Sequence, residues 1–138
     1  MSRVTVSHGI GDLAADLRTI AREAPVVLSG VVRDNIRAGN DLAKSYARTA
    51  NGPDSASRKY PGSFTAAMSK GFRGAVSSIY SGEYGPIARG QGELAHILEQ
   101  GLGHNAPQNN LAKSSDIIGP AFAHDAGRKA DGLFWPKS

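Results

Sequence analysis

The 138-residue sequence predicts a single domain that contains both α-helices and β-strands. Apolar residues recur with a helical period over 12–50 and 93–100, whereas 70–82 has the β-branched and aromatic composition of strands. The chain also has 17 Gly and 7 Pro, more than average usage, so we expect a lean core and long irregular connections. Such connections either serve a function or become ordered against another molecule.

The N-terminal part of the chain predicts an arm followed by helices. Val4 and Val6 alternate with polar residues, which suits a short strand or an extended arm placed against a neighbour. A helix is expected from Asp12, a plausible N-cap. Pro25 is expected to stop or kink it and to start a second helix, in which Gly39 predicts a bend or a close helix contact. The result is a long, kinked helix pair.

Beyond this pair, the predicted elements are short. They are a helix over 63–68, one or two strands over 70–82, a turn over 82–86, a helix over 93–100, a strand at 117–118 and a last helix over 120–130.

Four segments are expected to become ordered on assembly, because they are turn-rich or lie next to a chain end. The last of them places Phe134 and Trp135 beside the terminus, where they either fold back as a lid on the core or dock on another subunit. These segments are the N-terminal arm (1–11), the loops 51–63 and 101–115, and the tail (131–138).

Composition excludes several classes of protein. With no Cys, the chain has no disulfide framework, thiolate nucleophile, thiolate zinc site or iron–sulfur cluster. It lacks a secretion signal and an apolar run long enough to span a bilayer, so we expect a soluble protein made in the cytoplasm with no membrane partner. A net charge of +4 only mildly favours an anionic partner.

A metal site or nucleotide site is weakly indicated at most. Glu93, His96 and Glu99 occupy adjacent positions on one helix, as in half of a di-iron site, but the second Glu-x-x-His copy is missing. An exposed helix face explains these three residues as well, and a metal-dependent hydrolase built on them would be an alternative class. Of the other histidines, His104 lies in a predicted mobile loop, and His8 and His124 lack the neighbours of a triad or zinc site. The glycine pairs do not continue into nucleotide-binding motifs, so no cofactor is expected.

Basic residues align on one face of the second predicted helix. Arg33, Arg37, Lys44 and Arg48 follow spacings of four, seven and four, so they form a stripe that could lie near DNA phosphates. The alternative is a solvated outer face, partly neutralised by neighbouring aspartates. Arg58 and Lys59 in the following loop would extend the stripe.

Four short segments carry a resemblance to a known family. They are AKSYA at 43–47, YPGSFTAAM at 60–68, AHILEQG at 95–101 and GPAF at 119–122. In order and spacing they resemble the motifs of the tail-completion and head–tail joining proteins of long-tailed bacteriophages, the family named after gene product ten of phage HK97. The resemblance covers roughly residues 12–130.

The resemblance implies an α+β fold: a small, mainly antiparallel sheet packed by the long kinked N-terminal helix pair, a short middle helix and a C-terminal helix. It also implies a non-enzymatic virion protein at the head–tail junction, synthesised in the host cytoplasm. This protein would form a ring of six copies between the connector or stopper and the tail tube, with DNA passing through the lumen.

Partner contacts are expected at exposed apolar and aromatic positions. The alternative function is a small, basic, non-enzymatic nucleic-acid-binding protein that acts as a monomer or dimer. The candidates for contacts between subunits or with partners are Val4, Val6, Tyr60, Tyr84, Leu102, Phe134 and Trp135.

Overall fold

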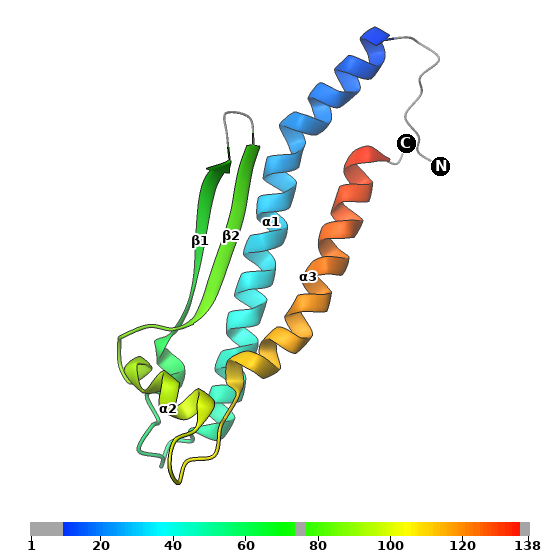
Figure 1. Cartoon of the computed structure of the whole chain (residues 1–138). Coiled ribbons are helices and arrows are strands. Elements are labelled where there is room, and N and C mark those ends of the chain that lie inside the picture. Colours follow the sequence, from blue (N-terminus) through cyan, green and yellow to red (C-terminus); the bar gives the residue numbers. More distant parts are fainter. Residues whose placement is uncertain (1–9, 74–76, 136–138) are drawn as a thin grey trace.

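The computed structural model describes residues 10–73 and 77–135, and in these ranges the fold is α+β, as predicted. Figure 1 shows two long helices side by side and a hairpin that rises along the first of them. The elements are α1 (Ile10–Ala50), the 3₁₀ helix η1 (Tyr60–Ser63), β1 (Phe64–Arg73), β2 (Ser77–Pro86), the 3₁₀ helix η2 (Gly92–Leu94), α2 (Ala95–Gln100) and α3 (Asn110–Phe134).

Helix α1 runs without interruption through Pro25, so the predicted stop and second start at this residue are wrong. A proline removes one helical hydrogen bond and crowds the carbonyl four residues earlier. The apolar period continues on both sides of Pro25, however, and Val31 is buried one turn and a half beyond it. Tertiary packing along one continuous face therefore outweighs the local penalty. The helix begins at Ile10, two residues before the predicted N-cap.

Helix α3 packs antiparallel along α1 (Figure 1). Near its start the Lys113 ammonium lies 5.7 Å from the centre of the Tyr46 ring, and further along Asn35 Nδ2 donates to Asp125 Oδ2 at 3.2 Å. The predicted strand at 117–118 is wrong, because these residues lie inside α3, and the predicted loop 101–115 ends at residue 109. Packing of α3 along α1 stabilises the helix, although Ile117 and Ile118 favour strand and Pro120 disfavours helix.

Strands β1 and β2 form a two-stranded antiparallel hairpin in which Phe64 pairs with Pro86 and Met68 with Gly82. The predicted strands over 70–82 are found, but both strands are longer than expected. The predicted helix over 63–68 and turn over 82–86 are wrong, since most of these residues form the paired ends of the strands. A Cβ added to Gly82 would lie 2.6 Å from Ile36 Cγ1, so β2 runs close against α1.

The hydrophobic core is small, as the composition predicted. Its central cluster is Ala43, Ala47, Tyr60 and Phe64, and the rings of Tyr60 and Phe64 meet edge to face at 5.1 Å. Tyr60 belongs to the loop 51–63, which was expected to become ordered on assembly but packs against the core of its own subunit. Within the described ranges, none of the helices combines the length and apolar character that crossing a membrane requires.

Candidate functional site

The basic stripe on α1 lies on the surface. Arg33, Arg37 and Arg48 are exposed and Lys44 is half-buried, while the positions of α1 that contact α3 and the hairpin lie on the opposite side of the helix. Arg33 Nε lies 3.7 Å from Asp34 Oδ1, an exposed ion pair that contributes little to stability. The stripe is therefore exposed, as both interpretations of it require.

The loop that was expected to extend the stripe is anchored beneath its basic residues. Arg58 and Lys59 are exposed. The backbone N–H of Lys59 donates to Gln91 Oε1 at 2.7 Å, and Gln91 Nε2 donates to the carbonyl of Ala56 at 2.6 Å. One glutamine thus fixes the backbone of this turn, and the two cations project from a defined position.

Glu99, a candidate metal ligand by its spacing from His96, is the centre of a buried polar cluster. Glu99 is only 8% exposed. Oε1 accepts hydrogen bonds from the Tyr60 hydroxyl at 2.9 Å and from Asn110 Nδ2 at 3.0 Å. Oε2 accepts one from the backbone N–H of Leu111 at 3.2 Å. The expectation of an exposed helix face is therefore wrong for Glu99, although Glu93 and His96 are exposed.

This carboxylate supports the start of α3. The N-cap residue, Asn109, has a left-handed backbone with φ of 54° and makes no side-chain cap hydrogen bond. Glu99 places negative charge at the positive end of the 25-residue helix and accepts one of its first N–H groups. Burial, reinforced by the hydrogen bond to Glu99 and by its charge, raises the pKa of Tyr60. In the described part of the chain, no group of three acidic, His or Cys side chains is placed to hold a metal ion.

A pair of amides joins the end of α1 to the approach to α3. Asn51 Nδ2 donates to Gln108 Oε1 at 2.8 Å, and Gln108 Nε2 donates back to Asn51 Oδ1 at 3.0 Å. Gln108 Oε1 also accepts from Asn110 Nδ2 at 3.0 Å. Sequence reasoning missed this cluster and the one at Glu99. The one available signal was the run of three amides at 108–110, which indicates turns as readily as buried contacts.

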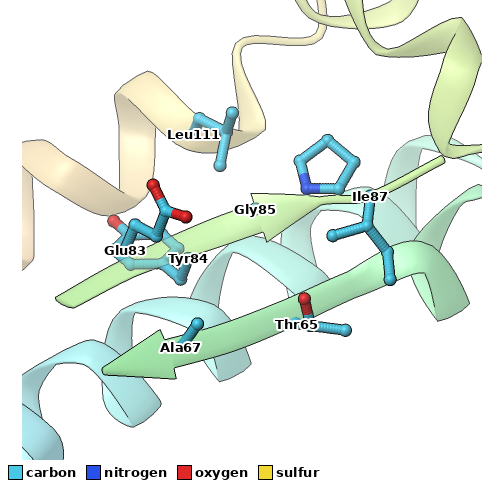
Figure 2. Close-up of a pocket in the computed structure, with 8 residues that line it drawn as sticks. Thr65, Ala67, Glu83, Tyr84, Gly85, Ile87 and Leu111 are labelled. Carbon is cyan, nitrogen blue, oxygen red and sulfur yellow. The ribbon is translucent and has the colours of Figure 1, made fainter. Parts of the chain in front are cut away.

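A shallow groove lies on the sheet face that points away from α1, beside the start of α3. Figure 2 shows Leu111 of α3 above β2, with Thr65 and Ala67 on β1 across the sheet. The hollow measures about 380 Å³. A second hollow of about 390 Å³ shares Tyr84 and Leu111 with it and reaches Ile36 of α1. The lining is largely small or apolar, which is suited to a protein contact.

The candidate contact residues are placed differently from one another. Tyr60 is fully buried, so its predicted role in contacts between subunits is wrong; its hydroxyl is used by Glu99. Tyr84 is half-buried, and its hydroxyl lies 2.8 Å from Ser114 Oγ. Val4 and Val6 lie outside the described residues. The remaining candidates, Leu102, Phe134 and Trp135, are exposed.

Comparisons of the chain with protein families, with curated proteins and with solved structures find no match.

Proposed function

We propose that this protein is a structural subunit of a long-tailed bacteriophage, and that copies of it form a ring at the head–tail junction through which DNA passes. Its partners are other copies of itself, the connector or stopper, and the tail tube. The number of copies, six, is taken from the sequence resemblance. The role is one of assembly and has no catalytic step.

The observation that carries this proposal is the distribution of apolar side chains. The central cluster is small, whereas large apolar side chains are exposed on both long helices, the hairpin and the loops. Single exposed apolar residues are ordinary, but many of them around a small core favour burial between subunits. The exposed residues are Leu17, Val26, Met68, Ile87, Leu102, Ile117, Phe122, Phe134 and Trp135.

The exposed basic stripe supports a position beside DNA. Arg33, Arg37 and Arg48 are free of contact with the core, so a ring can turn this face of α1 toward its channel. Contacts between such cations and phosphates are weakened by salt and independent of sequence, which permits DNA to move past them.

The proposal is tested by measuring mass as a function of concentration with light scattering, and by adding the purified chain to tail tubes. We expect either a discrete ring or a monomer that binds the end of the tube. A chain that stays monomeric at all concentrations and does not bind tubes would contradict the proposal.

The same stripe favours a second candidate, a nucleic-acid-binding protein that acts as a monomer or dimer. If all four stripe cations contact phosphates, the logarithm of DNA affinity should fall with the logarithm of salt concentration with a slope of about −3.6. A monomer with this slope supports the second candidate. A ring with weak DNA binding supports the first.

A further inference from the structure

The outer edge of β1 is open to pairing. Ile87 N donates to Ser63 O at 3.0 Å, in line with the register of the hairpin. Hydrogen-bonded pairs alternate along an antiparallel ladder, so residues 65, 67 and 69 point their backbone groups at β2. Ala66 and Met68 therefore direct theirs outward. Pro86 fits this alternation, because it pairs with Phe64 at a position that needs no N–H inside the ladder.

Over residues 65–69, no other described segment pairs with this edge. Figure 1 shows β1 as the outer strand, with β2 between it and α1. Apart from the hairpin ladder, residues 65–69 make no backbone hydrogen bond with another described segment. The strand contains no proline, a residue that commonly protects such edges. A two-stranded hairpin is also marginally stable by itself, so a third strand would stabilise it.

The edge has an apolar side. Met68 lies over Gly82 on the side of the hairpin that faces α1, and it remains 42% exposed. Ala66, two residues earlier and on the same side, is exposed as well. A strand that pairs with this edge should therefore carry two apolar residues at a spacing of two.

The N-terminal arm has this pattern. Val4 and Val6 are β-branched, are separated by one residue and alternate with Arg3, Thr5 and Ser7. In an extended arm both valines lie on one side, where they can cover Ala66 and Met68, and the polar residues lie on the other.

The arm of the same chain is too short to reach this edge. Met68 and Ile36 both lie beside Gly82, because a Cβ added to Gly82 would be 2.9 Å from Met68 Sδ and 2.6 Å from Ile36 Cγ1. Ile36 is 26 residues beyond Ile10, which is about 39 Å along the helix. The four residues from Val6 to Ile10 span at most about 14 Å when fully extended. Only the arm of another copy can bring Val6 beside Met68.

We propose that the N-terminal arm of one copy, residues 2–7, adds as a third strand to the outer edge of β1 in a neighbouring copy. Val4 and Val6 cover Ala66 and Met68 there, and backbone hydrogen bonds supply the rest of the contact. Each copy then gives an arm and receives one, which is a head-to-tail contact that can close into a ring. This inference rests on the proposed function, since it requires assembly.

The first test compares assembly of three variants with that of the full chain by light scattering. We expect loss of the ring when residues 1–7 are removed and when Val4→Asp and Val6→Asp are combined. The matched control, Thr5→Asp with Ser7→Asp, adds the same charge to the other side of the arm and should retain the ring. Circular dichroism verifies that each variant keeps its fold.

The second test uses the absence of cysteine. A Val6→Cys copy and a differently tagged Met68→Cys copy, mixed under oxidising conditions, should form a disulfide between copies, whereas Thr5→Cys in place of Val6→Cys should not. If the full chain assembles and the truncated chain assembles equally well, or no disulfide forms in the ring, the arm inference is overturned and the proposed function stands. If the full chain neither assembles nor binds tail tubes, the proposed function itself is overturned.

Discussion

Tyr60 links the apolar core to the polar cluster that starts α3. Its ring packs against Phe64, and its hydroxyl donates to the buried Glu99. Because its pKa is raised in the folded state, the unfolded chain loses this proton first as pH rises. The contribution of this group to stability is therefore full and independent of pH below its ordinary pKa, near 10, and above that pKa stability falls by up to about 1.4 kcal/mol per pH unit.

We predict that Tyr60→Phe lowers the free energy of unfolding by about 1 kcal/mol at neutral pH and removes this alkaline fall. Urea denaturation at a series of pH values measures both effects. Tyr80→Phe, which changes a phenol outside the core cluster, is the control. An equally steep alkaline fall in Tyr60→Phe would contradict the assignment.

Glu99 shows how far a single residue can be interpreted from sequence. Its spacing from His96 correctly placed both on one short helix, but spacing does not reveal which turn faces the core. That depends on Asn110 and Leu111, whose donors come from an element 11 and 12 residues further along the chain.

Glu99→Gln is expected to lower the free energy of unfolding by about 1–3 kcal/mol, because it removes the buried charge at the start of α3 and puts an amide donor among donors. Glu93→Gln, an exposed change of the same kind, should stay within about 0.5 kcal/mol of the parent. Thermal or urea unfolding of the pair decides; similar values for the two variants would argue against a central role for Glu99.

At the scale of elements, Gly39 is the place where α1 admits the hairpin. A Cβ added there would lie 2.5 Å from Cε1 of the Tyr84 ring, whereas one added at Gly30 would have its nearest neighbour at 3.5 Å, the end of the Arg33 side chain. A close contact is therefore found at Gly39, but it is made by a strand and not by a helix as expected.

Gly30→Ala should therefore stabilise the protein by about 0.5–1 kcal/mol, the usual gain in a helix interior. Gly39→Ala would give the same gain in helix stability, but the added methyl group must displace the Tyr84 ring. We therefore expect a net destabilisation of about 1–3 kcal/mol. The two melting temperatures should move in opposite directions; a rise in both would show that Tyr84 does not pack as described.

The elements that sequence reasoning missed share one cause. Ala66, Ala67 and Met68 favour helix in isolation, and Ile117 with Ile118 favours strand. The first group becomes a strand through pairing with residues 82–84, and the second becomes helical because α3 packs along α1. Local propensity carries no information about these distant partners, so it could not predict either element. The prediction of helix for α1 was correct because the residues that pack against the rest of the protein recur with the same period that favours a helix locally.

For the whole molecule, the sequence predicted the fold class, the lean core and an exposed basic face. It did not predict which loops are internal: 51–63 is fixed by Tyr60, Asn51 and Gln91, all of which depend on segments at least 32 residues away. The loop 51–63 was predicted to become ordered only on assembly, but contacts within one subunit already order it.

The basic stripe provides a prediction at this scale. Arg37→Glu with Arg48→Glu should leave the melting temperature and the ring almost unchanged, since both residues are exposed, but should reduce DNA delivery by the assembled virion. Arg89→Glu with Lys129→Glu makes the same charge change elsewhere and should reduce it less. Equal infectivity of the two double variants would place the stripe away from DNA.

The pairing of the first helix with the last also governs what happens during synthesis. Asn35 finds Asp125 only after 90 further residues have been made. At ordinary rates of translation this takes roughly 5 to 20 seconds, and for most of that time α1 is complete but the face that packs against α3 has no partner from its own chain. On one messenger RNA, successive ribosomes would hold several such helices near one another, so the subunit has an opportunity for incorrect pairing before it has one for correct folding.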